Sequence, residues 1–186
     1  MSARDPTARR RPAVFFDRDG IVNRSPGPGY VERVEDFHLL PAFIAALRIV
    51  RRRGYEAVIV TNQRGVALGR VRPEALQEMH ARLRAALAAE GLRLLDILVC
   101  TTDNDADPRR KPNPGMITEA AECHELDLAR SWMIGDSERD IEAGRRAGCG
   151  TTVRVAPSGE RTAADLRVPD IESLPGLLEQ MLPAVE

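Results

Sequence analysis

At 186 residues, with 43% hydrophobic and 30% charged side chains, the chain can bury a continuous core and has an ordinary globular composition. Its formal net charge of −1 argues against nucleic acid or an anionic membrane as a partner, because either would require a basic surface. The three cysteines (Cys100, Cys123 and Cys149) are odd in number and widely spaced, so we expect free thiols in a reducing cytoplasm, not a disulfide framework.

The first twelve residues, with their arginines and small or polar side chains, are predicted to form a flexible tail. The apolar run that follows, at 13–16, ends at Asp17 and is too short for a secretion signal. No stretch approaches the ~18 apolar residues that a membrane span requires. We therefore expect one domain over residues 13–186, with no membrane association.

From residue 13 onward, short apolar strands alternate with amphipathic helices. Runs of β-branched and apolar residues predict strands, and apolar residues three and four apart, with suitable proline and glycine punctuation, predict helices. In chain order these are a strand at 13–16, a helix at 41–53, a strand at 57–60, a helix at 73–90, a strand at 94–99, a helix opened by Asn113 and Pro114, a strand at 132–134, a helix at about 138–147, a strand at 151–155 and a helix at 174–182. The alternation predicts an α/β fold, a three-layer sandwich with helices on both faces of a central parallel sheet.

Four segments that follow predicted strands carry polar residues of a related chemical kind. They are Asp17 and Asp19, then Thr61 and Asn62, then Arg110 and Lys111, and finally Asp136, Ser137 and Asp140. Helix capping or turn formation explains any one pair on its own. At one edge of a parallel sheet, however, carboxylates so crowded repel each other unless a cation such as Mg²⁺ lies among them. A lysine and helix N-termini beside that cation fit a phosphate group.

In this order the segments resemble the four motifs of the haloacid dehalogenase superfamily, a set far more specific than an isolated pair of aspartates. The matching residues are Asp17-Arg18-Asp19-Gly20, Thr61-Asn62-Gln63, Arg110-Lys111-Pro112 and Gly135-Asp136-Ser137 followed by Asp140. The resemblance runs from about Val14 to Val155 and is greatest to the histidinol-phosphatase and heptose-bisphosphate-phosphatase branch. It implies a Rossmann-like core and a phosphatase activity.

The resemblance also implies catalytic roles. Asp17 would be the nucleophile that forms an acyl-phosphate, and Asp19 the general acid and base, with the intervening Arg18 pointing away from the site. Thr61 would hold phosphoryl oxygens, and Lys111 would neutralise both nucleophile and phosphate. Lys111 is the only lysine among 27 basic residues, which supports its role because a compact ammonium is not replaced by a planar guanidinium.

The resemblance implies Mg²⁺ as the cofactor. The ion would bind the Asp17 carboxylate, the Asp19 carbonyl and Asp136, with Asp140 steadying those ligands. Relatives commonly carry a zinc loop before the lysine motif, of which only Cys100 is present, and a single cysteine cannot form a zinc site. We therefore expect no zinc.

The loop after the third predicted strand also imitates the start of a calcium loop. It places Asp103, Asp105 and Asp107 at alternate positions, but Pro108 and Pro114 stand where a calcium loop needs glycine and glutamate. The three acids are therefore expected to be solvated loop residues.

Residues 23–37 leave room for a flap but not for a large cap domain, so an open site for a small phosphorylated substrate is expected. The residues expected to bind that substrate are Gly29, Tyr30, Asn62, Gln63, Arg64, Arg110 and Ser137. The favoured reaction removes the C7 phosphate of D-glycero-D-manno-heptose 1,7-bisphosphate, and histidinol phosphate or another small sugar or nucleotide phosphate is the alternative. An alternative of another class is a non-catalytic phosphosugar-binding protein, although binding alone would not require Asp19. The protein is expected to be a monomer or small homo-oligomer.

Overall fold

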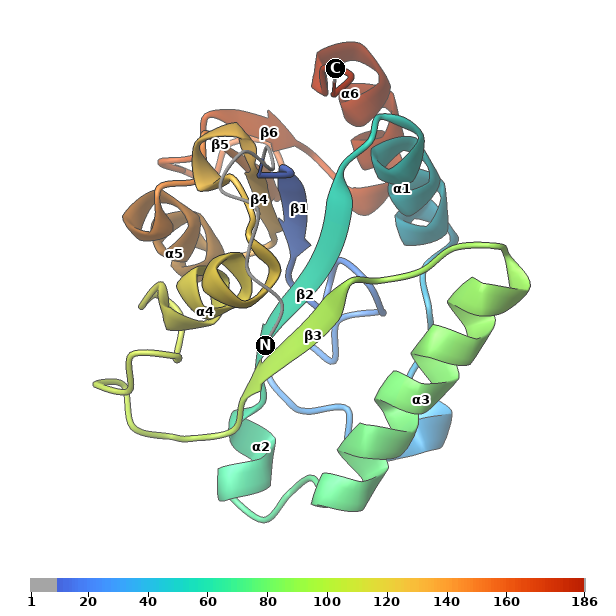
Figure 1. Cartoon of the computed structure of the whole chain (residues 1–186). Coiled ribbons are helices and arrows are strands. Elements are labelled where there is room, and N and C mark those ends of the chain that lie inside the picture. The colour runs from blue at the N-terminus through green and yellow to red at the C-terminus, as the bar shows by residue number, and fades with distance from the viewer. Residues whose placement is uncertain (1–9, 186) are drawn as a thin grey trace, which may run out of the picture.

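A fully parallel sheet of six strands forms the centre of the computed structural model, which describes residues 10–185 (Figure 1). In chain order the strands are β1 (Ala13–Phe16), β2 (Glu56–Asn62), β3 (Asp96–Cys100), β4 (Trp132–Gly135), β5 (Thr151–Val155) and β6 (Leu166–Val168). They lie side by side in the order β3-β2-β1-β4-β5-β6. Strand order therefore reverses at β1, which pairs with β2 on one side and β4 on the other, and ligands of such sheets bind at this switch point.

Helices cover both faces of the sheet (Figure 1). One face carries α1 (Pro41–Arg52), α3 (Pro73–Ala89) and α6 (Leu174–Met181), and the other carries α4 (Gly115–His124) and α5 (Glu138–Ala147). The short helix α2 (Arg64–Ala67) follows β2, and three 3-10 turns lie at Val34–Asp36, Leu128–Arg130 and Ile171–Ser173. Proline stands at the start of α1 and α3, where its missing N–H leaves no helical hydrogen bond unmade.

The side chains on the two faces of β1 belong to two separate hydrophobic clusters. Val14 and Phe16 point toward α1, whereas Ala13 and Phe15 point toward α4 and α5, and all four side chains are fully buried. Phe16 meets the ring of Phe43 edge-on, with 5.3 Å between ring centroids. The strand is apolar throughout because helices cover both of its faces, and this rigid packing fixes the position of the residue that follows it.

The predicted three-layer α/β sandwich is confirmed, and each predicted strand and helix is present with small changes in its bounds. The strand predicted at 57–60 extends over Glu56–Asn62, so the polar pair Thr61-Asn62 belongs to β2 and does not follow it. The elements α2 and β6 were not predicted, since four and three residues are too few for a periodic apolar pattern.

The chain packs against the sheet before β1 begins. Of the expected flexible tail at 1–12, residues 1–9 lie outside the described residues. Arg11 forms a parallel bridge with Leu126, and its guanidinium lies 2.5 Å from the Glu56 carboxylate. The Pro12 carbonyl accepts a hydrogen bond from the Glu56 N–H at 3.0 Å. Ordered contacts therefore begin at least two residues before Ala13.

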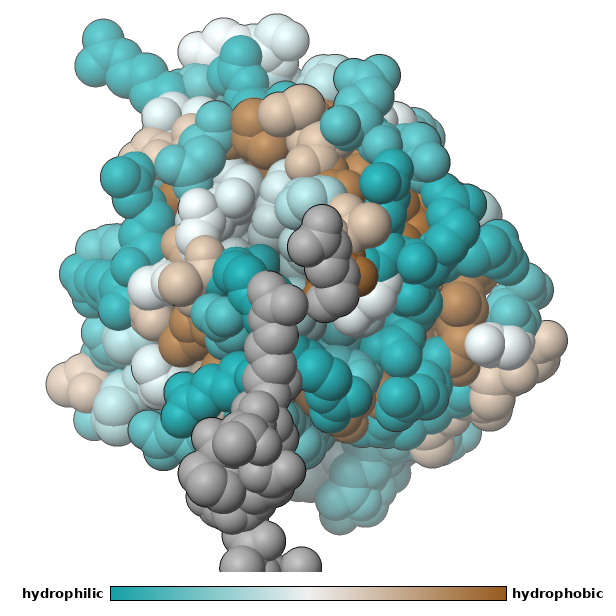
Figure 2. Space-filling view, turned by 45° about the horizontal axis from the view of Figure 1, so that its top comes forward, coloured by the Kyte–Doolittle hydropathy of each residue, from teal (hydrophilic) through white to brown (hydrophobic). Residues whose placement is uncertain are grey.

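The segment between β1 and α1 contains one 3-10 turn and no folded cap domain, as expected from its length. Hydrophilic side chains cover most of the face seen in Figure 2, and hydrophobic ones gather there only in small separate areas. Within residues 10–185, each helix is too short or too polar to cross a membrane.

Candidate active site

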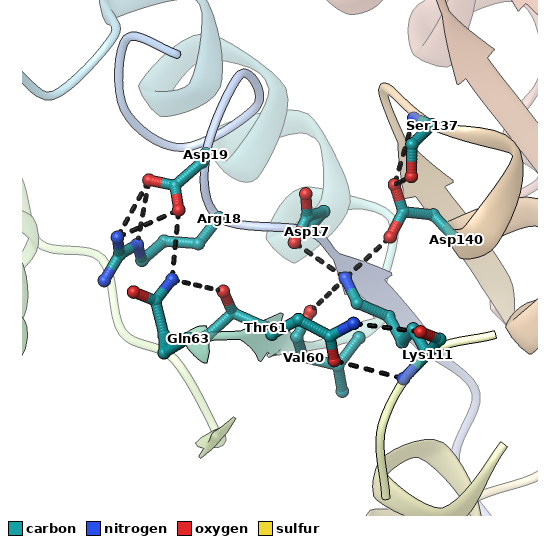
Figure 3. Close-up of polar contacts among 10 residues, drawn as sticks. Asp17, Arg18, Asp19, Val60, Thr61, Gln63, Lys111, Ser137 and Asp140 are labelled. Atoms are coloured by element: carbon teal, nitrogen blue, oxygen red, sulfur yellow. Dashed lines mark hydrogen bonds and ion pairs between the residues drawn. The ribbon is translucent and has the colours of Figure 1, made fainter. Parts of the chain in front are cut away.

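The carboxyl ends of β1, β2 and β4 lie at one edge of the sheet, and the motif residues converge there (Figure 3). Asp17 directly follows β1, and its backbone N–H donates to the Ile134 carbonyl at 2.9 Å, which fixes it against β4. Asp136 follows β4, and Lys111 reaches the same place from the loop after β3. Segments more than a hundred residues apart in sequence therefore share one site.

Lys111 lies at the centre of the contacts at this edge. Its Nζ is 2.7 Å from Asp17 Oδ1 and 2.6 Å from Asp140 Oδ1, and it donates to the Val60 carbonyl at 2.8 Å. The side chain is only 3% exposed, and this burial lowers the pKa of the ammonium group. The two carboxylates outweigh burial and raise that pKa above its ordinary value, so Lys111 is held as a cation.

The side chain of Asn62 fixes the backbone of Lys111. Asn62 Oδ1 accepts from the Lys111 N–H at 3.1 Å, and Asn62 Nδ2 donates to the Lys111 carbonyl at 2.9 Å. These two hydrogen bonds connect the end of β2 to the loop that carries Lys111. They leave the lysine stem little freedom to move its charge away from Asp17.

Three carboxylates crowd together beside this ammonium group. One oxygen each of Asp17, Asp136 and Asp140 lies within 4.8 Å of the others. Burial and the charge of Asp140 raise the pKa of Asp17 to about 7, although Lys111 opposes them, and the same two causes raise that of Asp136 to about 6. A divalent cation with oxygen ligands would relieve this repulsion, so the cluster is suited to hold a metal ion.

The close approach of the carboxylates depends on two glycines. A Cβ atom at Gly20, where φ is 90°, would lie 2.1 Å from Asp136 Oδ2, and one at Gly135 would lie 2.4 Å from Asp140 Oδ2. Only glycine fits at these positions. Asp140 is fixed in turn by the first turn of α5, because its Oδ2 accepts from the Ser137 N–H at 3.0 Å and from Ser137 Oγ at 2.7 Å.

Asp19 is held by three donor side chains. Its Oδ1 accepts from Arg18 Nη2 at 2.8 Å and from Asn23 Nδ2 at 2.9 Å, and its Oδ2 accepts from Gln63 Nε2 at 3.0 Å. Gln63 Nε2 also donates to Thr61 Oγ1 at 2.9 Å (Figure 3). Arg18, which was expected to point away from the site, is buried and contacts Asp19, because a buried guanidinium requires a counter-charge and Asp19 supplies it.

A cavity of about 390 Å³ opens over these groups. Its lining consists of Asp17, Asp19, Ser25, Pro26, Gly27, Gly29, Tyr30, Asn62, Lys111, Asp136, Ser137, Arg139 and Asp140. Four of the predicted substrate-binding residues are in this lining, namely Gly29, Tyr30, Asn62 and Ser137. The flap expected at 23–37 therefore forms one wall, and the motif residues form the floor.

Four other predicted site residues lie outside that lining. Thr61 and Gln63 are 1% and 3% exposed and form the hydrogen bonds behind Asp19. Arg64 is exposed at the start of α2. Arg110 is mostly buried, and it donates from Nε to Asp105 Oδ1 at 2.7 Å and from Nη1 to the Thr102 carbonyl at 3.1 Å.

Sequence reasoning missed Arg139, an exposed residue of the first turn of α5 that lines the cavity. The signal was present, because Arg139 directly precedes Asp140 within the fourth motif. It was overlooked because the motif fixes only the flanking residues.

A larger cavity, of about 590 Å³, lies near Tyr55 and Trp132 at the amino ends of the strands and contains none of the motif residues.

Comparison with known proteins finds relatives that include several heptose-1,7-bisphosphate phosphatases. The family described as HAD-hydrolase-like matches residues 108–174. The chain is 38% identical to D-glycero-beta-D-manno-heptose-1,7-bisphosphate 7-phosphatase of Rhodopseudomonas palustris, covering 76% of this chain and 82% of that protein. It is 35% identical to D-glycero-alpha-D-manno-heptose-1,7-bisphosphate 7-phosphatase of Burkholderia mallei, covering 77% and 79%. The structure of D,D-heptose 1,7-bisphosphate phosphatase from B. bronchiseptica, complexed with magnesium and phosphate, aligns with a TM-score of 0.77 at 28% identity, covering 91% and 98%.

Proposed function

Because the chain belongs to the haloacid dehalogenase superfamily, in the family of the heptose-1,7-bisphosphate 7-phosphatases, we propose that it removes the C7 phosphate of D-glycero-D-manno-heptose 1,7-bisphosphate through an aspartyl-phosphate on Asp17. The observation that carries the proposal is the contact between Lys111 Nζ and Asp17 Oδ1, at 2.7 Å, beside two further carboxylates. This arrangement suits covalent transfer of a phosphoryl group better than binding alone.

The reaction proceeds in two displacements at phosphorus. In the first, an oxygen of Asp17 attacks, the bond from phosphorus to the ester oxygen breaks, and the departing oxygen takes a proton from Asp19. In the second, a water molecule attacks the phosphorus of the aspartyl-phosphate and gives a proton to Asp19. The Asp17 carboxylate is regenerated and inorganic phosphate leaves.

Lys111 lowers the barrier to both displacements. The nucleophile and the phosphate are both anionic, and a buried ammonium between them offsets their repulsion at short range. The same cation keeps Asp17 more ionised than burial alone would allow, because Lys111 lowers the pKa that burial and Asp140 raise. A carboxylate in this setting is the nucleophilic form.

Asp19 must change its contacts during the cycle. Both of its oxygens accept hydrogen bonds, from Arg18, Asn23 and Gln63. One of these donors has to give way before Asp19 exchanges a proton with substrate or water. Gln63 therefore acts on Asp19 and not on the substrate, which revises the role that the sequence alone favoured.

The acidic cluster fits Mg²⁺, with Asp17 and Asp136 as carboxylate ligands, the Asp19 backbone carbonyl as a further ligand and Asp140 in support. When bound, the ion would polarise the phosphoryl group and neutralise negative charge in the transition state. The fit rests on the three carboxylates, whose oxygens lie within 4.8 Å of one another. Burial and the charge of Asp140 raise the pKa values of Asp17 and Asp136, and a cation in the cluster would offset both effects.

The open cavity suits a small sugar phosphate. Tyr30 and the flap around Gly29 form a wall against which a polar carbon chain can lie. Arg139 lines the same cavity, and its charge acts on Asp105 together with the charges of Arg64 and Arg110, so a second anionic group of the substrate near Arg139 would meet positive charge. The unpaired cysteines support a reducing cytoplasmic location for this chemistry.

The proposal predicts phosphate release from heptose 1,7-bisphosphate with a kcat/KM at least tenfold above that for histidinol phosphate, other sugar phosphates and nucleotides. Both anomers belong in this panel, since relatives of either name are similar to the chain. Activity should require added Mg²⁺ after treatment with a chelator. A preference for histidinol phosphate over both heptose anomers would contradict the substrate assignment.

Metal binding should strengthen as pH rises, because the pKa values of Asp17 and Asp136 are raised. Folded Asp17 and Asp136 hold protons more tightly than they do in the unfolded chain, so the metal-free protein should lose stability as pH rises from about 4 through 7. Protons compete with Mg²⁺ for the same oxygens, so Mg²⁺ should stabilise more at pH 8 than at pH 5.5. A concentration of 100 times Kd stabilises by about 2.7 kcal/mol, which is roughly 5–10 °C in Tm.

Thermal unfolding with Mg²⁺ and with NaCl of equal ionic strength measures this difference. The shift specific to Mg²⁺ should be roughly 5–10 °C at pH 8 and at most about half as large at pH 5.5. Equal shifts at the two pH values would contradict binding at Asp17 and Asp136.

A further inference from the structure

The acidic loop between β3 and Lys111 holds one carboxylate unlike its neighbours. Asp107 Oδ1 accepts from the Arg109 N–H at 2.8 Å, which is an ordinary turn contact. Asp105 instead accepts from Arg110 Nε at 2.7 Å across the loop, although its own side chain is 82% exposed. The Arg110 side chain is 4% exposed, so the Asp105 carboxylate covers a buried guanidinium at the surface.

Arg110 contacts this carboxylate, and the charges of two further arginines act on it. The hydrogen bond and charge of Arg110, with smaller contributions from Arg139 and Arg64, lower the pKa of Asp105. Arg139 also lines the cavity over Asp17, so one of the three arginines that act on Asp105 belongs to that cavity. Within residues 10–185, the side chains of Arg64 and Arg139 make no hydrogen bond or ion pair, which leaves the positive charge in excess over Asp105.

We propose that Asp105 is a tethered competitor for this arginine group and thereby sets how tightly the protein holds a substrate that carries a second anionic group. The inference rests on the proposed function, in which the reacting phosphate lies at Asp17 and the rest of the substrate extends toward the cavity mouth. A second phosphate that approaches Arg110 must displace the Asp105 carboxylate from Nε. The competitor is always present because the loop carries it, so it weakens binding of the second phosphate without touching the reacting one.

The effect should be moderate, because the carboxylate that must be displaced is largely in water. Exposed ion pairs contribute little, so its removal should tighten binding of the second anion by about threefold to fivefold. The direction of the change in KM is informative, because loss of a residue that itself bound or ordered the substrate would raise KM.

The test compares Asp105→Asn with Asp103→Asn, which removes the same charge from the same loop two residues earlier. Each is assayed on heptose 1,7-bisphosphate and on heptose 7-phosphate, which differ only in the second phosphate. Asp105→Asn should lower KM for the bisphosphate about threefold to fivefold, with KM for the 7-phosphate and both kcat values within about twofold. Asp103→Asn should leave all four constants within about twofold of the unaltered protein.

Equal changes in KM for both substrates, no change, or an increase for the bisphosphate would overturn the proposal. If the unaltered protein hydrolyses neither heptose phosphate, the proposed function fails instead. The role of Asp105 is then decided with p-nitrophenyl phosphate as substrate. Inhibition by fructose 1,6-bisphosphate should strengthen about threefold in Asp105→Asn, while inhibition by fructose 6-phosphate stays the same. Equal responses to the two inhibitors would contradict the role of Asp105.

Discussion

Asp17→Asn is expected to reduce turnover by about 1000-fold or more while leaving the fold intact. The change removes the nucleophilic oxygen and one carboxylate of the metal cluster. Asparagine has nearly the same shape, and Lys111 retains its contacts with Asp140 and the Val60 carbonyl, so the surrounding packing should survive. The amide is also uncharged, which removes both the cost of burying a carboxylate and its repulsion with Asp140 and Asp136, the effects that raise the pKa of Asp17.

Phosphate release, circular dichroism and thermal unfolding at pH 8 measure these outcomes. We expect native secondary structure and a metal-free Tm no lower than that of the unaltered protein. Asp36→Asn, an exposed change of the same kind, should leave turnover within twofold. Acid-quenched reactions of the unaltered protein should retain phosphate that hydroxylamine releases, as an acyl-phosphate requires. Turnover of Asp17→Asn within tenfold of the unaltered protein would contradict the covalent mechanism.

Lys111→Arg is expected to lose about 100-fold in kcat, although it preserves the charge. The Lys111 Nζ has acceptors at 2.6, 2.7 and 2.8 Å, and its side chain is 3% exposed, so a larger cationic group cannot keep all three contacts in place. A planar guanidinium would displace the Asp17 carboxylate or the phosphoryl group by ~1 Å. Lys111→Ala should lose at least as much, because the anions would then face each other without the ammonium.

The matched control for this change is Arg109→Lys, the reverse substitution two residues earlier. Arg109 is 44% exposed and paired with Glu119, so its replacement should leave kcat within about twofold. Steady-state kinetics on p-nitrophenyl phosphate suffices for the comparison and requires no knowledge of the natural substrate. Full kcat in Lys111→Arg would show that the buried ammonium has no part in the reaction.

The sequence predicted the fold wherever a helix or strand was long enough to show a periodic pattern of apolar residues. The helix predicted at 73–90 is observed at Pro73–Ala89, since its apolar face repeats through several turns. The short strand β6 lacks such a pattern and exists because β5 offers an edge with which it can pair. Local propensity contains no information about that partner.

The site was predictable as a set of positions but not as a set of orientations. Motif spacing placed Asp17, Asp136 and Lys111 at one edge of a parallel sheet, where the structure has them. The same reasoning did not predict the contact between Arg18 and Asp19, and it assigned Gln63 to the substrate, whereas Gln63 donates to Asp19. Buried polar side chains point wherever they can satisfy hydrogen bonds, and those partners come from other parts of the chain.

The double use of Asp140 restricts how this protein can evolve or be engineered. One carboxylate oxygen completes the capping box at the start of α5, and the other contacts the ammonium of Lys111. At most helix starts, glutamate, glutamine and aspartate are exchangeable during sequence drift or in a thermostabilising redesign. Here a longer side chain would move the counter-charge of Lys111, and a neutral one would remove it. Natural variation at this helix start should therefore be confined to its solvent-facing positions. A design that replaced Asp140 to improve α5 as an ordinary helix would stabilise the helix and reduce the activity of the enzyme.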